Sequence, residues 1–244
     1  MVKAHPPFSI LARVYDGLMD DVPYEGWADF VLAALAGEGF VPRGLLELGV
    51  GTGNALLPFL RRGLLTAGID SSEEMLAAAR AKLPGSVRLE RADFRSFDLG
   101  ERFDLVYSAF DSLNNLTEPT DLQKTFAAAL RHLNPGGWLA ADLNTPAGLR
   151  ELWREEDWEE DGVRLIYGYD PETKLGRLEA WVGGELEVHL ERGYEPEEVA
   201  AMLRAAGFEN VFCLTYPEGR PPHPLSDRFW VFARAPHHAQ QAGR

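Results

Sequence analysis

Residues 44 to 144 alternate short apolar runs with amphipathic stretches, and this alternation limits the possible folds more than any other feature of the chain. The apolar runs predict strands at 44–50, 65–70, 87–93, 103–110 and 138–144. The stretches between them predict helices at 54–63, 71–85 and 121–137. Strands that alternate with helices usually form a parallel sheet covered on both faces. Because crossovers between such strands are right-handed, we predict an α/β fold with a doubly wound sheet.

Three further regions complete the predicted domain. Residues 1–43 contain two amphipathic stretches, which predict an N-terminal helical cap. Residues 156–193 alternate apolar and polar side chains between turn signals, which predicts a small antiparallel insertion of three strands. A helix at 195–208 and two closing strands follow, so that the main sheet would have seven strands. We expect residues 1–244 to form a single domain.

The composition limits the partners of the protein. Its 38 acidic and 24 basic residues give a formal net charge of -14, which disfavours nucleic acid and anionic membrane surfaces. The single cysteine, Cys213, excludes an internal disulfide and a cysteine-rich metal site. Because the sequence shows neither a signal peptide nor a membrane-spanning apolar stretch, we expect a cytoplasmic protein, either a monomer or a homodimer.

The first predicted strand ends in "LLELGVGTGN", in which Gly49, Gly51 and Gly53 occupy every second position. Ligands of doubly wound sheets bind beyond the carboxyl ends of the strands, where missing side chains let backbone N–H groups approach the ligand. A plain tight turn would also use glycine. A dinucleotide-binding turn would show Gly-x-Gly-x-x-Gly, whereas here the spacing differs and an acid, Glu47, precedes the glycines. An acid at this position suits a cationic ligand better than a pyrophosphate.

This turn resembles the first motif of the class I S-adenosylmethionine (SAM)-dependent methyltransferases, and further motifs follow in the order of that family. Asp70 ends the second strand, and "RADFRSF" follows the third. "FDLVYSAFDSLNNL" resembles the fourth-strand motif, and "LRHLNPGGWLAADLNTP" resembles the helix, turn and fifth strand. The resemblance covers about residues 40–235. It implies a Rossmann-like methyltransferase sheet, SAM as the cofactor and methyl transfer as the activity.

The resemblance also implies which residues bind the cofactor. Asp70 would bind both ribose hydroxyls, Asp93 would face the adenine amine, and the backbone near Ser108 and Ala109 would face the methionine moiety. The expected cofactor-binding residues are Tyr15, Glu47, Gly49, Gly51, Gly53, Asp70, Ser71, Met75, Ala92, Asp93, Phe94, Ser108 and Ala109. Each role has a purely structural alternative. Asp70 could cap the next helix and Asp93 could be a solvated loop acid, while Glu47 could brace the glycine turn and Met75 could belong to the core.

The N-terminal "LARVYDGLMDDVPYEGWADFV" is similar to the opening of small-molecule methyltransferases that act on amines, amino sugars and related metabolites. The similarity implies that Tyr15 folds over the cofactor and that the insertion at 156–193 roofs the substrate pocket. We therefore expect direct, in-line methyl transfer to a small molecule. The catalytic candidates are Tyr15 and His189, whose ordinary pKa of about 6.5 suits a general base. Helix packing for Tyr15 and an exposed strand face for His189 are the alternatives.

Other functions remain open in the sequence. "SAFDSL" follows the fourth strand, where adenine and cytosine methyltransferases carry Asn/Asp-Pro-Pro-aromatic. Asp111, Asp142 and Asn144 could hold a metal as in catechol-type enzymes, but that family has its later Asp and Asn adjacent, so we expect no metal. His237 and His238 lie near the end of the chain and are weak ligand candidates. A non-catalytic SAM-binding or interaction protein and a dinucleotide oxidoreductase are the rival functions. The sequence specifies neither the acceptor nor the atom methylated.

Overall fold

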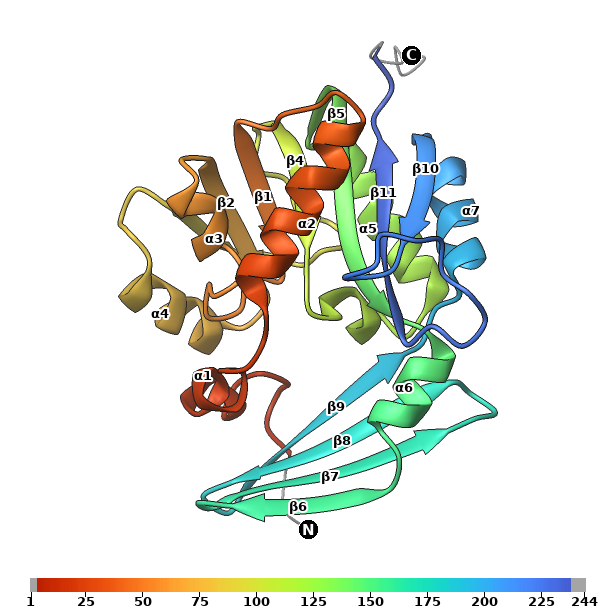
Figure 1. Cartoon of the computed structure of the whole chain (residues 1–244). Helices are drawn as coiled ribbons and strands as arrows, with labels where there is room; N and C mark the ends of the chain where they lie inside the picture. The colour runs from red at the N-terminus through yellow and green to blue at the C-terminus, as the bar shows by residue number, and fades with distance from the viewer. Residues whose placement is uncertain (1–3, 238–244) are drawn as a thin grey trace.

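Seven strands form the main sheet of the protein, whose computed structural model describes residues 4–237 (Figure 1). The strands are β1 (Gly44–Leu48), β2 (Leu65–Asp70), β3 (Arg88–Arg91), β4 (Phe103–Ser108), β5 (Leu133–Asn144), β10 (Glu209–Leu214) and β11 (Arg228–Arg234). Their order across the sheet is β10-β11-β5-β4-β1-β2-β3. β11 runs antiparallel to β5 and to β10, and the pairs among β1 to β5 are parallel. The predicted doubly wound, seven-stranded sheet is confirmed.

Helices cover both faces of this sheet (Figure 1). They are α2 (Tyr24–Gly37), α3 (Leu57–Arg61), α4 (Glu73–Lys82), α5 (Pro119–Arg131) and α7 (Pro196–Ala206), with the shorter α1 (Tyr15–Leu18), α6 (Pro146–Leu152) and the 3-10 turns η1 (Leu11–Arg13) and η2 (Ser112–Asn115). α2, α3 and α4 pack on one face, and α5 and α7 pack on the other. Within residues 4–237, no helix has both the length and the apolar character needed to cross a membrane.

The side chains of β1 divide the core into two halves. Leu46 and Leu48 belong to the cluster beneath α5 and α7, whereas Leu45 belongs to the cluster beneath α2, α3 and α4. Successive side chains of a strand point to opposite faces, and all three leucines are buried. A parallel strand that is covered on both faces therefore appears in the sequence as a mainly apolar run, which in β1 is interrupted only by the buried Glu47.

The helix predicted at 121–137 is wrong at its end, because β5 already begins at residue 133. Gly136 has a φ of +76°, and a Cβ on Gly137 would lie 2.9 Å from the backbone oxygen of Asp104. These glycines do more than stop a helix. They let the first residues of β5 lie close to the neighbouring chain.

The N-terminal cap contains one long helix, α2, where the sequence predicts two. The stretch before α2 forms only η1 and α1. Phe8 has a φ of +60°, which an α-helix does not accommodate. The backbone N–H groups of residues 8–11 hydrogen-bond to the side chain of Glu187 rather than to helix carbonyls. The helix predicted at 54–63 is likewise reduced to the short α3.

The insertion contains four strands where the sequence predicts three. They are β6 (Glu156–Glu160), β7 (Val163–Asp170), β8 (Leu175–Val182) and β9 (Glu185–Arg192), and each pairs antiparallel with the next. The sequence did not predict β6, because "EDWEE" has a single apolar residue, Trp158. It is an edge strand, and exposed acidic side chains on such a strand oppose pairing with another chain. The four-stranded sheet lies across the lower end of the main sheet in Figure 1.

Substitution of Gly148 tests how closely α6 packs on the segment before β11. A Cβ at this position would lie 1.9 Å from the backbone oxygen of Asp227, so we expect Gly148→Ala to lower the free energy of unfolding by at least about 1–3 kcal/mol. Gly37→Ala, in α2, meets no atom within 4 Å and should leave stability unchanged or raised by up to about 1 kcal/mol. Chemical denaturation of both variants checks this, and equal stabilities would contradict the packing described.

Candidate functional site

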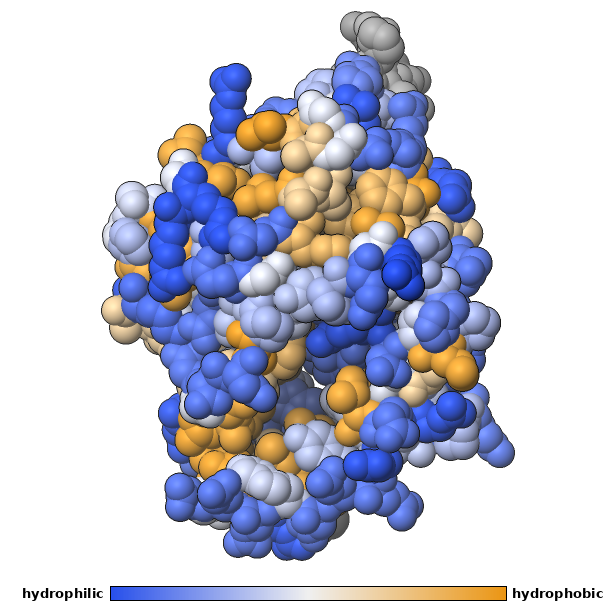
Figure 2. All heavy atoms as spheres, viewed as in Figure 1, coloured by the Kyte–Doolittle hydropathy of each residue, from blue (hydrophilic) through white to orange (hydrophobic). Residues whose placement is uncertain are grey.

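A cavity of about 500 Å³ lies at the carboxyl ends of the parallel strands, where doubly wound sheets bind their ligands. One side is formed by the turn after β1 and by the ends of β2 and β4. The other side is formed by the inner face of the four-stranded sheet, and the N-terminal segment closes the space between them. Figure 2 shows a hollow between the body of the molecule and its lower, four-stranded part.

The three glycines of the turn after β1 differ in what surrounds them. Gly49, Gly51 and Gly53 have φ values of +76°, +52° and +87°, in the left-handed region that favours glycine. A Cβ on Gly49 would lie 2.7 Å from the hydroxyl of Ser112, and one on Gly53 would lie 2.7 Å from Leu83. A Cβ on Gly51 would meet no protein atom within 4 Å. Gly53 therefore serves packing, whereas Gly51 leaves open space at the cavity wall.

Asp70 joins the glycine turn to the start of α4. Its Oδ2 accepts a hydrogen bond from the Gly51 N–H at 2.9 Å, and its Oδ1 accepts one from the Ser72 N–H at 2.8 Å. Burial raises the pKa of Asp70, while these two N–H groups act in the opposite direction. Ser72 itself caps α4, because its hydroxyl accepts the Met75 N–H at 3.1 Å. Asp70 is thus left to line the cavity beside Ser71.

Glu47 lies behind the glycine turn and does not line the cavity. It is 1% exposed, and its Oε2 has no hydrogen-bond partner in the described residues. Burial, and then the nearby charge of Asp70, raise the pKa of Glu47 well above its ordinary value. Burial thus favours the protonated form of this carboxyl group.

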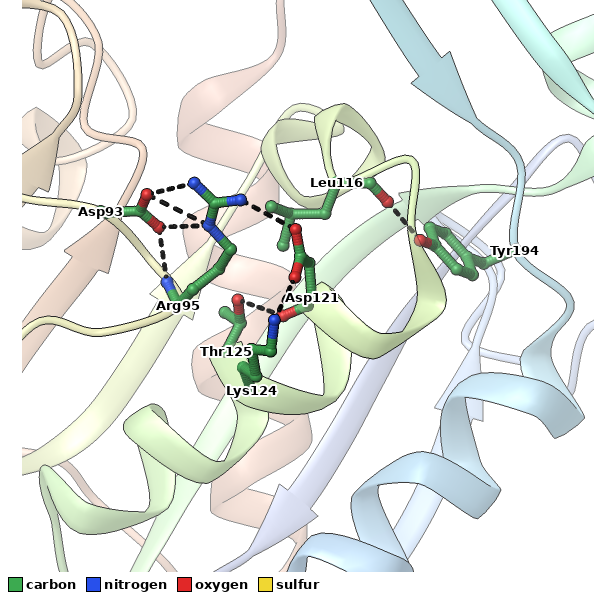
Figure 3. Close-up of polar contacts among 7 residues, drawn as sticks. All are labelled: Asp93, Arg95, Leu116, Asp121, Lys124, Thr125 and Tyr194. Carbon is green, nitrogen blue, oxygen red and sulfur yellow. Dashed lines mark hydrogen bonds and ion pairs between the residues drawn. The ribbon is translucent and has the colours of Figure 1, made fainter.

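Asp93 forms an ion pair with Arg95, and the pair extends to Asp121 (Figure 3). Arg95 Nε donates to Asp93 Oδ1 at 2.8 Å, and Arg95 Nη1 donates to Asp121 Oδ2 at 2.8 Å. The hydrogen bond from Arg95 lowers the pKa of Asp93, although its partial burial opposes this. Phe94 lines the cavity, whereas Asp93 does not. An adenine amine would therefore have to donate to a lone pair of the Asp93 carboxylate that Arg95 does not already occupy.

The chain turns sharply after β4 and brings polar groups to the cavity. Phe110 and Asp111 have φ values of +53° and +50°, which is costly for residues other than glycine and is concentrated at functional sites. Both residues line the cavity. Ser108 lies deeper, because its hydroxyl donates to the Leu48 carbonyl at 3.0 Å, and the Ala109 carbonyl accepts the hydroxyl of Ser112 at 2.9 Å.

A buried polar cluster lies at the acceptor end of the cavity, a term we use for the part lined by the four-stranded sheet and Arg228. Arg228 Nη2 lies 3.1 Å from Asp142 Oδ2 and 3.4 Å from Asp111 Oδ2. Burial raises the pKa of Asp142 to about 6, although Arg228 acts in the opposite direction. Burial, and then Asp111, also raise the pKa of Glu191 well above its ordinary value. Oε2 of Glu191 has no hydrogen-bond partner in residues 4–237.

The residues considered for a metal site bind one another instead. Asn144 Nδ2 donates to Asp111 Oδ2 at 2.7 Å, so the amide turns an N–H toward the carboxylate. Asp142 faces Arg228, as described above. The described part of the chain holds no group of three or more His, Cys, Asp or Glu side chains that could bind a metal ion. His238 lies outside the described residues.

The polar face of β9 is its buried face. Glu187, His189 and Glu191 are 0%, 3% and 7% exposed, whereas Leu190 is 44% exposed. The alternative in which His189 lies on an exposed strand face is therefore wrong. His189 and Glu191 both line the cavity. Sequence reasoning did not identify Glu191 or Arg228 as site residues, because the inward face of an antiparallel strand is normally the apolar one.

Tyr15 lines the cavity together with residues from both of its ends. Tyr15 is half-buried, and burial is the main cause that raises the pKa of its phenol well above the ordinary value. Tyr24 and the charges of Asp111, Glu191 and Asp70 raise this pKa further. Asp70 belongs to the glycine-turn side, whereas Asp111 and Glu191 belong to the acceptor end, and Tyr15 lines the same cavity as these three residues. The raised pKa keeps Tyr15 a neutral phenol.

The structure thus brings together part of the expected cofactor site. The expected residues that line the cavity are Tyr15, Gly49, Gly51, Asp70, Ser71, Met75 and Phe94. Those that lie outside its lining are Glu47, Gly53, Ala92, Asp93, Ser108 and Ala109. Met75 is 1% exposed, so that it combines a core position with a place at the cavity wall.

Comparison with known proteins identifies the family. Residues 45–137 match a family model described as a methyltransferase domain. YqeM of Bacillus subtilis, a protein named as a methyltransferase, is 30% identical over 215 residues, which cover 81% of this chain and 85% of YqeM. The chain belongs to the family of SAM-dependent methyltransferases. The dTDP-3-amino-3,4,6-trideoxy-alpha-D-glucopyranose N,N-dimethyltransferase of Streptomyces venezuelae is 40% identical over 197 residues, 72% of this methyltransferase and 79% of that one.

Solved structures show the same fold for this methyltransferase. A SAM-dependent methyltransferase from Clostridium acetobutylicum superposes with a TM-score of 0.79 and 25% identity, covering 93% of this chain and 98% of that one. The CcbJ methyltransferase from Streptomyces caelestis superposes with a TM-score of 0.75 and 27% identity, covering 95% of this chain and 98% of that one. The dinucleotide oxidoreductase and the non-catalytic protein are therefore set aside.

SAM is the cofactor of this methyltransferase family, and the residues present fit it. The fit rests on the open space in front of Gly51 and on a carboxylate, Asp70, at the edge of the same cavity. One carboxylate has enough lone pairs to accept two ribose hydroxyls while it keeps its backbone hydrogen bonds.

We expect Gly51→Val to abolish SAM binding without unfolding the protein, because the added methyl groups would fill space at the cavity wall. Gly63→Val is the matched control. Gly63 also has a positive φ, of +82°, and open space around it, but it does not line the cavity. Both variants carry similar backbone strain, and only the first should lose binding by calorimetry. Normal SAM binding by Gly51→Val would show that the cofactor does not approach this turn.

We expect Asp70→Ala to weaken SAM binding by roughly 2–4 kcal/mol, since two charge-assisted hydrogen bonds to the ribose would be lost. Part of the effect would come from the Gly51 N–H, which loses its acceptor. Calorimetry gives the affinity, and circular dichroism verifies the fold. Unchanged affinity in a folded variant would place the ribose elsewhere.

Proposed function

We propose that this methyltransferase transfers the methyl group of SAM directly and in line to a small-molecule acceptor. The observation that carries the proposal is the cavity, which continues from Gly51 and Asp70 to the inner face of the four-stranded sheet. The net charge of -14 argues against a nucleic acid in this space. We also propose that the protein is cytoplasmic, and its single free cysteine, which suits a reducing compartment, supports this location. A monomeric or homodimeric state is a further part of the proposal.

The walls of the acceptor end indicate the kind of molecule that would fit. Trp153, Trp158 and Tyr167 supply aromatic surface, and Leu165 and Leu178 supply aliphatic surface. The polar cluster of Asp111, Glu191 and Arg228 lies at the same end. An acceptor with an apolar or flat body and a hydrogen-bonding nucleophile, an amine or a hydroxyl, suits these walls. Because the Streptomyces venezuelae relative is named for dimethylation of an amino-sugar nitrogen, amines come first in any screen.

Bound SAM supplies an activated methyl group, so the residues of the chain have mainly to bind, orient and exclude water. Orientation of two reactants can lower a barrier by roughly 7–11 kcal/mol. Tyr15 and the N-terminal segment would cover the cavity and exclude water. His189 would accept a proton from an acceptor that arrives protonated, and its Nε2 lies 2.7 Å from Glu187 Oε1.

The catalytic roles predict different outcomes for the two candidates. Once a metabolite screen that reads S-adenosylhomocysteine has found an acceptor, we expect His189→Ala to lower kcat by at most about a hundredfold. Tyr15→Ala should raise the Kd for SAM and lower kcat together, because it opens the cavity to water. A trapped methylated enzyme, complete inactivity of a folded His189→Ala variant, or efficient and salt-sensitive methylation of DNA or RNA would refute the proposal.

A further inference from the structure

The carboxylate of Glu187 is surrounded by backbone donors of the N-terminal segment, which we define as residues 4–14. Oε2 accepts the N–H groups of Ser9 at 3.1 Å, Ile10 at 2.8 Å and Leu11 at 3.2 Å. Oε1 accepts the N–H of Phe8 at 3.1 Å. The left-handed φ of Phe8, +60°, lets these successive N–H groups converge, as in the backbone concavities that bind anions. Four donors from one short segment thus meet a single side chain of the insertion.

The same carboxylate contacts His189. Glu187 is fully buried, and its Oε1 lies 2.7 Å from His189 Nε2. Burial alone would raise the pKa of Glu187, but the hydrogen bond with His189 and the backbone N–H groups outweigh it and lower the pKa. An ionised carboxylate only accepts hydrogen bonds, so Nε2 must carry a proton. A neutral His189 then has its lone pair on Nδ1.

The N-terminal segment also reaches the cofactor side of the cavity. The hydroxyl of Ser72 donates to the Phe8 carbonyl at 2.7 Å, beside Asp70 and Ser71. Just after the segment, Asp16 accepts hydrogen bonds from Thr52 Oγ1 at 2.6 Å in the glycine turn. Phe8 and Leu11 line the cavity, and the ring of Phe8 packs 4.5 Å from that of His189. Movement of this segment would therefore change both the cofactor wall and the surroundings of His189.

We propose that Glu187 is a positioning residue, which holds the N-terminal segment over the cavity and fixes His189 as the tautomer with its lone pair on Nδ1. The carboxylate and the segment depend on each other. Without Glu187 the buried N–H groups of Ile10 and Leu11 lose their acceptor, and without the segment a buried charge loses most of its donors. The part that concerns His189 as a base rests on the proposed function, whereas the closure of the cavity does not.

The wild-type protein provides a first test that needs no substitution. Ile10 lies outside any helix or strand, yet its amide should exchange at least about tenfold more slowly than an unstructured amide, as should that of Leu11. In the neutral form of His189, the imidazole ¹⁵N spectrum should show a protonated Nε2 and an unprotonated Nδ1. Unprotected amides in residues 9–11, or the opposite tautomer, would overturn the proposal.

Glu187→Gln and Glu185→Gln form the matched pair of variants. Glu185 lies on the same strand and also contacts the segment, through exposed ion pairs with Arg13 at 2.6 Å and His5 at 3.2 Å. We expect Glu187→Gln to speed dissociation of SAM at least about tenfold in stopped-flow fluorescence, and to change the His189 ¹⁵N shifts. Glu185→Gln should change dissociation by less than about threefold and leave those shifts in place.

The outcomes separate this proposal from the proposed function. Equal dissociation rates for Glu187→Gln and wild type, with unchanged His189 shifts, would overturn it. An equal effect of Glu185→Gln would also overturn it, because surface ion pairs would then be sufficient to hold the segment. If Glu187→Gln does not fold, the proposal is tested by the amide exchange of Ile10 and Leu11 and by the tautomer of His189 in the wild-type protein. None of these measurements needs an acceptor, so a failed search for one leaves the result intact.

Discussion

The hydrogen bond from the Gly51 N–H to the carboxylate of Asp70 connects the ends of β1 and β2, and the geometry of the cofactor side depends on it. It holds a turn with three left-handed glycines against the start of α4. Parallel pairing of β1 with β2 and β4 brings these ends to one edge of the sheet. The position of the cavity therefore follows from the topology, and its chemistry follows from the few side chains that each strand end contributes.

The second half of the site comes from elements that the parallel sheet does not require. The four-stranded insertion contributes aromatic walls and a buried polar face, and the N-terminal segment bridges the two halves. The segment is held mainly by the side chains of Glu187 on β9 and Ser72 at α4, together with one backbone hydrogen bond from His5 to Leu186. Such a segment can cover a bound cofactor, and it opens only when its hydrogen bonds to Glu187 and Ser72 break.

The sequence allowed the fold to be predicted where burial is uniform. β1 is an apolar run between two core clusters, interrupted only by Glu47, and Asp70 stands where an acid at a strand end would bind a ligand. The predicted strands and exposed faces were wrong where contacts with residues distant in the sequence, rather than the local pattern of apolar residues, determine the structure. β6 has almost no apolar residue, and the polar face of β9 turns inward, where Glu187 accepts N–H groups of the N-terminal segment and Glu191 lines the cavity. Nor does spacing reveal that Asp93 is paired with Arg95.

The central claim is that SAM binds with its reactive methyl group between the Asp70 side of the cavity and the acceptor end. The most direct test uses SAM labelled with ¹³C in that methyl group and measures nuclear Overhauser effects from it to the protein. Tyr15 lines this space, and so does His189. We predict cross-peaks from the methyl group to the ring protons of Tyr15, which disappear when S-adenosylhomocysteine displaces SAM. Saturable SAM binding without contacts to any residue that lines the cavity would contradict this account.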